Sequence, residues 1–198
     1  MIRLLDVTFS FIGLVLMSPL VFLIAVLIRV DSAGHIFYFQ TRVGRYGNDF
    51  RLIKFRTMVS GADRAGGLTV GARDSRITKT GYWLRRFKLD EIPQLFNVLT
   101  GDMSLVGPRP ELRKYTDLYT EKQQIVLSVR PGITDYASIE YFDENELLAA
   151  SADPEKTYIE KVMPAKIALN LRYISNPSTV EYLKILVLTI LKIFSNKA

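Results

Sequence analysis

The chain has 198 residues, which is enough for one modest globular domain with an appendage. Its formal net charge of +6 favours an anionic partner such as nucleic acid, acidic lipid or a phosphorylated substrate, although an ordinary solvated basic surface would give the same excess. The absence of cysteine excludes disulfides and thiolate zinc sites, and the single histidine, His35, leaves little for a Ser-His-Asp triad.

The N-terminal segment contains an uncharged apolar run at 7–28, close to the roughly 20 residues that a helix needs to cross a bilayer. A cleaved signal peptide fits poorly, because Asp6 directly precedes the run and no small-x-small cleavage site follows it. The composition becomes polar and mixed after Arg29. We therefore expect a retained membrane segment at 1–33 and a soluble domain at 34–198.

Ser18 and Pro19 lie at the centre of the apolar run. Pro19 cannot donate the helical hydrogen bond to the carbonyl of Val15, and its ring favours a kink. The residues leave two topologies open: a bent helix that spans the bilayer, and a re-entrant helix-break-helix whose ends share one face. Arg3 and Arg29, at the two ends, are compatible with two cytoplasmic ends.

The rest of the chain predicts an α/β fold, a mostly helical compact domain with a small β-hairpin or sheet. Gly44 and Gly47 supply the hairpin turn, and Asp153 with Pro154 is a typical helix start. In chain order, the expected elements are strands at 36–40 and 50–56, an exposed loop that could lie over a site at 60–79, a helix at 84–99 broken near Leu89 and Asp90, a helix at 111–127, a turn at 130–134, and helices at 143–152, 154–173 and 179–194.

The last of these helices is apolar but carries Lys184 and Lys192. Lysines along a mostly apolar helix suit a helix that lies in the headgroup region of a membrane. A terminal helix that packs on the core of the domain would show the same pattern, so both placements stay open.

Asp90 and Glu91 form the most informative pair of residues. Asp90 is a good helix N-cap, Pro93 suits a first turn, and Gly101 supplies a stop, so capping alone would explain an isolated pair. The same helix start would also stabilise an ionised aspartate, which is a competent nucleophile toward phosphorus. A neighbouring glutamate offers the hard oxygen that Mg²⁺ prefers, and Arg109 could contact phosphate.

The residues around this pair resemble a known family. The matching motifs are 89–99 (LDEIPQLFNVL), 101–104 (GDMS), 106–110 (VGPRP), 54–58 (KFRTM), 130–134 (RPGIT), and Phe39-Gln40 with Arg42 and Gly44. Together they look like the signature of bacterial sugar transferases, the small monotopic polyprenol-phosphate phosphoglycosyl transferases, also called undecaprenyl-phosphate sugar-phosphotransferases. Because chance rarely produces motifs of this length, the resemblance favours chemistry over capping alone.

The resemblance implies a specific reaction. The aspartate matching Asp90 attacks the β-phosphate of a UDP-sugar and releases UMP, and undecaprenyl phosphate then captures the phosphosugar from the aspartate. The glutamate matching Glu91 binds Mg²⁺, and the arginine matching Arg109 contacts phosphate. The further cations that we expect to bind the substrate phosphates are Lys54, Arg56, Arg85 and Lys88. This reaction is the first membrane step in the synthesis of a glycan such as O-antigen, capsule, exopolysaccharide or glycoprotein.

The resemblance also implies a location and a set of partners. The family's membrane helix is re-entrant and breaks at a Ser-Pro that matches Ser18 and Pro19. The expected site of action is the cytoplasmic face of the bacterial inner membrane, with amphipathic helices on the membrane surface. The expected partners are UDP-sugar, undecaprenyl phosphate and membrane lipids, without nucleic acid, and a homodimer is left open.

Two positions depart from the usual family pattern. Lys88 stands where a small hydroxyl residue is common, and residues 135–140 replace a stretch that usually contains Gly and Gln. The second departure leaves the identity of the sugar open. A different class of function also remains: a membrane-anchored basic protein that binds lipid or nucleic acid without catalysis. No Asp-x-Asp, P-loop or Gly-x-Gly-x-x-Gly motif supports another enzyme class.

Overall fold

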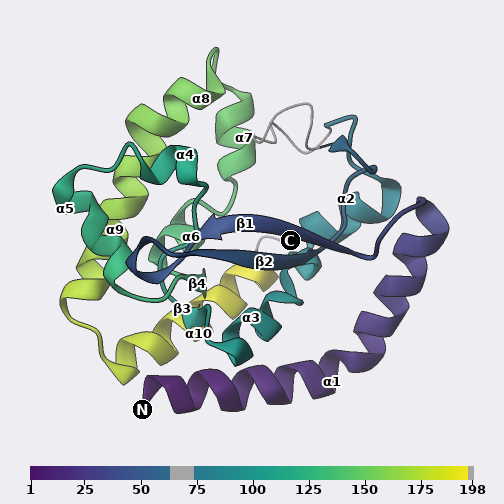
Figure 1. Ribbon diagram of the computed structural model, residues 1–198, viewed down its shortest axis with the longest axis horizontal. Helices are drawn as coiled ribbons and strands as arrows, with labels where there is room; N and C mark the ends of the chain where they lie inside the picture. The colour runs from purple at the N-terminus through teal and green to yellow at the C-terminus, as the bar shows by residue number, and fades with distance from the viewer. Residues whose placement is uncertain (63–73, 196–198) are drawn as a thin grey trace.

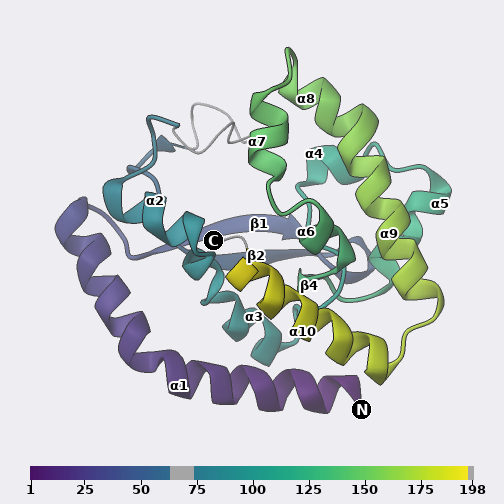
Figure 2. The same ribbon diagram turned by 180° about the vertical axis from the view of Figure 1, so that it is seen from behind.

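The computed structural model describes residues 1–62 and 74–195, which form a mostly helical protein with two small sheets (Figures 1 and 2). This agrees with the predicted fold class. The elements are α1 (Ile2–Asp31), β1 (Phe37–Val43), η1 (Arg45–Gly47), β2 (Asp49–Phe55), α2 (Lys79–Arg86), η3 (Leu89–Glu91), α3 (Gln94–Thr100), β3 (Ser104–Val106), α4 (Arg113–Thr116), α5 (Glu121–Gln124), η4 (Ile125–Ser128), β4 (Gly132–Thr134), α6 (Tyr136–Glu140), α7 (Glu144–Ala149), α8 (Pro154–Thr157), η5 (Tyr158–Val162), α9 (Met163–Ser175) and α10 (Thr179–Ser195).

Helix α1 is the one helix in the described ranges that is long and apolar enough to cross a membrane. It runs along the base of the molecule in Figure 1 and then turns up beside α2. Pro19 lies inside the helix, and the hydroxyl of Ser18 donates to the carbonyl of Val15 at 2.8 Å. This bond serves the carbonyl that Pro19 has no N–H to reach. Re-entry into a bilayer stays a prediction.

The two ends of α1 are attached to the rest of the protein in different ways. Near its start, Oδ1 of Asp6 accepts hydrogen bonds from the Ser104 hydroxyl, the Leu105 N–H and the Tyr182 hydroxyl at 2.7–2.9 Å. Near its end, Ile24 and Ile28 are buried in a hydrophobic cluster that also contains Phe55 and Leu84, from β2 and α2. The apolar helix is therefore held at both ends by the domain that follows it.

The predicted hairpin is confirmed. Strands β1 and β2 pair antiparallel, from Phe37 opposite Phe55 to Val43 opposite Asp49. In the connection between the strands, Tyr46 and Gly47 both have a positive φ. Gly47 adopts this conformation without steric strain because it has no Cβ. Of the loop predicted at 60–79, residues 63–73 lie outside the described residues, and Lys79 already belongs to α2.

A second, parallel sheet replaces the predicted turn at 130–134, which was wrong. Strand β4 pairs with β3, with Ser104 opposite Gly132 and Val106 opposite Thr134. A Cβ on Gly132 would lie 2.1 Å from the backbone nitrogen of Gly107, so only glycine permits this approach. Gly107 is the first residue of the Gly-Pro-Arg-Pro motif. The close approach of the two glycine backbones therefore fixes the position of the chain that carries Arg109.

The single helix predicted at 111–127 is also wrong. The segment forms α4, α5 and η4, with a new helix start at Thr120. The Thr120 side chain accepts from the N–H of Gln123, and the Gln123 side chain accepts from the N–H of Thr120, which makes a complete capping box. The predictions at 143–152 and 154–173 hold, and Asp153 caps α8 as expected, although a π-turn interrupts the second helix.

The C-terminal helix α10 packs on the core of the domain, which is one of the two placements that the sequence left open; its position in the headgroup region stays a prediction. Its Tyr182 and Ile185 are fully buried in the main hydrophobic cluster. On other faces of the same helix, Val187, Ile190 and Leu191 are more than half exposed. The helix therefore packs on the domain and also presents an apolar outer surface.

Candidate active site

A polar cavity of about 200 Å³ lies where the β1–β2 hairpin, the turn η3 and the helices α7, η5 and α9 come together. Cationic side chains outnumber carboxylates in its lining, so its charge suits an anionic ligand. The charged lining residues are Arg42, Lys54, Arg85, Lys88, Arg109 and Lys166 with Asp90, Glu91, Glu111 and Glu144. The cavity thus contains both predicted carboxylates and four of the five predicted phosphate-binding cations.

Glu91 is the electrostatic centre of this cavity. Its Oε1 accepts from Lys54 Nζ at 3.0 Å and from Arg109 Nη2 at 2.5 Å, and Arg109 Nη1 lies 3.4 Å from Oε2. Burial alone would raise the pKa of Glu91, but Arg109 and Lys54 outweigh that effect and hold the pKa well below its usual range. Glu91 is therefore a firmly ionised carboxylate.

Asp90 differs from its neighbour in both contacts and pKa. It is buried, and none of the described residues donates a hydrogen bond to it. Burial raises the pKa of the Asp90 carboxyl, Glu91 adds to that rise, and Lys54, Arg85 and Lys88 oppose it. A carboxylate with a raised pKa is more basic and, once ionised, a stronger nucleophile than an ordinary aspartate.

The predicted N-cap role of Asp90 is wrong. Asp90 lies inside the short turn η3, whereas α3 begins at Gln94 after Pro93, and no side chain caps it. The chain enters η3 through Lys88, whose left-handed backbone (φ 55°) reverses its direction after α2. Helix-end N–H groups therefore do not stabilise the charge of Asp90. The predicted helix stop at Gly101 is confirmed by its φ of 96°.

Arg109 reaches Glu91 from a rigid backbone. The N–H of Gly107 donates to Thr134 and the N–H of Gly132 donates to Pro108, which fixes the chain on one side. The backbone N–H of Arg109 itself donates to Oδ2 of Asp135, a fully buried residue that also caps α6. The guanidinium of Arg109 has a raised pKa because of Glu91 and stays charged.

Lys88 and Arg85 line the cavity, but within the described ranges neither forms an ion pair with Asp90 or Glu91. Burial lowers the pKa of each, and Asp90 and Glu91 act against that effect. Because both groups are partly buried and form no ion pair with the described residues, a phosphate in the cavity would gain from contacts with them.

Arg56 is the one predicted phosphate-binding residue that the structure does not bring to the cavity. Its guanidinium donates to the carbonyls of Ser32 and Ala33 at 2.6 and 3.0 Å, and to the Ser32 hydroxyl at 2.9 Å. These acceptors follow the end of α1, whose last carbonyls lack helical partners. Arg56 therefore fastens the apolar helix to the domain. Ser18 and Pro19 likewise lie within α1, as described above.

The donor set at the cavity is compatible with Mg²⁺. No group of three His, Asp or Glu side chains that could hold a metal is found in the described ranges 1–62 and 74–195. Magnesium often uses only one or two carboxylates, with water and substrate phosphates as its other ligands. Glu91 and the adjacent Asp90 supply such a pair, provided that Arg109 or Lys54 shifts from Glu91 to a phosphate.

Comparison with known proteins identifies the family. The family model described as "Bacterial sugar transferase" matches residues 1–196. The chain belongs to this family. A relative from Aeromonas hydrophila is named UDP-N-acetylgalactosamine-undecaprenyl-phosphate N-acetylgalactosaminephosphotransferase. It is 39% identical to this sugar transferase over 158 residues, which cover 78% of the chain and 36% of that relative.

Two further relatives differ in length. The uncharacterized sugar transferase EpsL of Bacillus subtilis is 39% identical over 191 residues, which cover 96% of this sugar transferase and 86% of EpsL. The UDP-glucose:undecaprenyl-phosphate glucose-1-phosphate transferase of Escherichia coli is 35% identical over 196 residues, 98% of this chain and 40% of that protein. This sugar transferase thus spans most of EpsL but well under half of the Aeromonas and Escherichia proteins.

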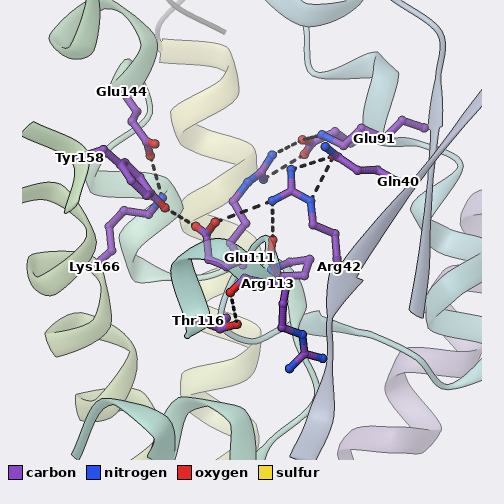
Figure 3. Close-up of polar contacts among 12 residues, drawn as sticks. Gln40, Arg42, Glu91, Glu111, Arg113, Thr116, Glu144, Tyr158 and Lys166 are labelled. Carbon is purple, nitrogen blue, oxygen red and sulfur yellow. Dashed lines mark hydrogen bonds and ion pairs between the residues drawn. The ribbon is translucent and has the colours of Figure 1, made fainter. Parts of the chain in front are cut away.

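The sequence did not assign roles to several residues in the cavity of this sugar transferase (Figure 3). Arg42 binds the side-chain oxygen of Gln40 at 2.8 and 3.1 Å and lies 3.7 Å from Glu111, which also accepts from the Tyr158 hydroxyl. On the other wall, Lys166 Nζ donates to Glu144 at 2.7 Å. Only Gln40 and Arg42 carried a sequence signal, because they belong to a family motif.

Proposed function

We propose that the chain transfers a sugar-1-phosphate from a UDP-sugar to undecaprenyl phosphate and releases UMP. One observation carries this proposal: Asp90 is a buried carboxylate without a hydrogen-bond donor among the described residues, in a cavity where cations predominate. Two relatives are named for transfer from a UDP-sugar to undecaprenyl phosphate, which supports the same donor and acceptor here.

In the first step, an Oδ atom of ionised Asp90 bonds to the β-phosphorus of the UDP-sugar. The bond from that phosphorus to the oxygen bridging the two phosphates breaks, and UMP leaves with the oxygen and its electron pair. Lys54 and Arg109, which hold Glu91 without substrate, are placed to neutralise the charge that develops on the phosphates. The product is a phosphosugar joined to Asp90 through an acyl-phosphate bond.

In the second step, a phosphate oxygen of undecaprenyl phosphate attacks the same phosphorus. The bond from phosphorus to the Asp90 oxygen breaks, which restores the carboxylate and leaves a polyprenyl-diphosphate sugar. Lys88, which lines the cavity, is placed to bind the incoming phosphate. A bound Mg²⁺, held by Glu91, would supply further neutralisation of phosphate charge.

The decisive experiment replaces Asp90 with Asn and measures UMP release from UDP-sugars, beginning with UDP-N-acetylgalactosamine and UDP-glucose. We expect a loss on the order of a thousandfold or more, because the amide cannot form the acyl-phosphate bond. The native protein, without acceptor, should instead accumulate an adduct on Asp90 visible by intact mass. Asp117→Asn, at an exposed aspartate, is the matched control.

Two results would overturn the proposal: UMP release by Asp90→Asn at the native rate, or binding to anionic lipid or nucleic acid that falls steeply with salt while no UDP-sugar is turned over. The second result would favour the basic binding protein.

We also propose that α1 is re-entrant in the inner membrane and that the cavity faces the cytoplasm. The bend of α1 in Figure 1, the presence of Pro19 inside this helix and its exposed apolar surface support this topology. Because the chain has no cysteine, single cysteines at Leu4 and Val30, both largely exposed, report on the two ends. Both should react with a reagent supplied on the cytoplasmic side. Reaction of the two ends from opposite sides would show a spanning helix.

A further inference from the structure

A second cavity, of about 230 Å³, adjoins the polar one and has the opposite chemistry. Its apolar lining comes from the segment leading into α3, from β4, from α6 and the residues that follow it, and from α10. The side chains that define it are Ile92, Leu95, Ile133, Ile139, Phe142 and Ile193. We call this cavity the apolar groove.

The apolar groove meets the polar cavity at charged residues. Lys88, Glu91 and Arg109 line both, so a molecule in the groove can place one end beside Asp90. The Phe142 ring lies 5.0 Å from Lys88 Nζ and 5.9 Å from Lys192 Nζ. The groove is therefore apolar along its walls and cationic at the end nearest the carboxylates, which complements a ligand with an apolar body and an anionic head.

The groove is also continuous with an apolar surface. Figure 2 shows α10 passing between α6 and α1, with α3 at its side. Ile193 of α10 lines the groove, whereas Ile190, one turn earlier on the same face of the helix, is more than half exposed. A long apolar chain that leaves the groove along α10 would therefore stay on apolar side chains and not enter water.

We propose that the apolar groove holds the head end of the isoprenoid chain of the acceptor, with its phosphate between Lys88 and Lys192 and next to Asp90. The polar cavity then takes the nucleotide sugar. This inference rests on the proposed function, since it names the place where that reaction's lipid substrate binds. It divides the site into a donor side, which carries the charges, and an acceptor side, which carries the aliphatic and aromatic walls.

The test fills the groove without touching the polar cavity. Ile193→Trp places an indole in the groove, and Leu191→Trp places the same group on the exposed face of the same helix. In Ile193→Trp the indole should displace part of the isoprenoid chain, which then loses a few buried methylene contacts. The concentration of undecaprenyl phosphate needed for half-maximal transfer should therefore rise roughly tenfold. UMP release and adduct formation without acceptor should stay unchanged, and Leu191→Trp should change neither half-reaction.

A second readout does not depend on catalysis. A prenyl phosphate that carries a diazirine near its phosphate, added without UDP-sugar in phosphatidylcholine nanodiscs, should crosslink to peptides from α6 or α10. Undecaprenyl phosphate should compete with the crosslink, whereas inorganic phosphate and phosphatidic acid should not. Equal competition by phosphatidic acid would show a general lipid site and overturn the inference.

The outcomes separate this inference from the proposed function. An unchanged acceptor requirement in Ile193→Trp, or crosslinks confined to other elements, would overturn the inference even if UMP release is normal. A native protein that crosslinks at the groove but releases no UMP from any UDP-sugar would overturn the proposed function and leave the groove as a prenyl phosphate site.

Discussion

Asp6 and Asp90 are both buried aspartates, 2% and 7% exposed, but their surroundings differ. Asp6 is held by three neutral donors at the junction of α1, β3 and α10, and it lines neither cavity. Asp90 lines the polar cavity, receives no hydrogen bond from the described residues and is surrounded by cations. Burial alone therefore does not mark a reactive carboxylate: several neutral protein donors on one carboxylate indicate a structural role, whereas a carboxylate without such donors in a charged cavity indicates chemistry.

The comparison predicts its largest effect on stability at Asp6. Asp6→Ala should lower the free energy of unfolding by about 3–5 kcal/mol, because the Ser104 hydroxyl, the Leu105 N–H and the Tyr182 hydroxyl lose their shared acceptor. Thermal or denaturant unfolding in detergent measures this loss. Tyr182→Phe removes one donor and should cost only about 1 kcal/mol.

The same variants also test whether Asp6 is only structural. The folded fraction of Asp6→Ala should still release UMP at the native rate per folded molecule. If the stability were unchanged and the turnover fell, the roles assigned to the two aspartates would be reversed.

A smaller effect, of opposite sign, is expected at Asp90. Because its pKa is raised in the folded protein, ionised Asp90 costs stability at neutral pH, and that cost disappears as pH falls through the raised pKa toward the unfolded value near 3.8. Asp90→Asn should therefore unfold at a higher temperature than the native protein at pH 7, and the difference should shrink toward pH 4. A variant less stable than the native protein at pH 7 would show that the cations outweigh burial.

The sequence located the site through contiguous motifs. Asp90, Glu91 and Arg109 lie within one run of the sequence, so their proximity could be predicted without tertiary contacts. Lys54 came only from a family motif, and it reaches Glu91 because β2 packs beside η3.

The remaining features depend on contacts between distant segments. Arg56 was expected at phosphates, but the open carbonyls after α1 attract it more directly, and nothing local signals that contact. Strands β3 and β4 have three residues each, too few for a periodic pattern. Lys166 and Tyr158 enter the cavity only because α9 and η5 pack beside α7 and the Gly-Pro-Arg-Pro segment.

The Asp6 contact also sets an order of events during synthesis. Its two partners in β3 follow it by about a hundred residues, and Tyr182 follows it by 176. At about 5–20 residues per second, a ribosome needs roughly 10–35 s after making Asp6 to reach Tyr182. Ser104 and Leu105 can bind the carboxylate as soon as β3 has been made, but the third donor comes only with α10. A nascent chain stalled before α10 should therefore hold the start of α1 through β3 and α3 alone, without the bond that ties Asp6 to the C-terminal helix.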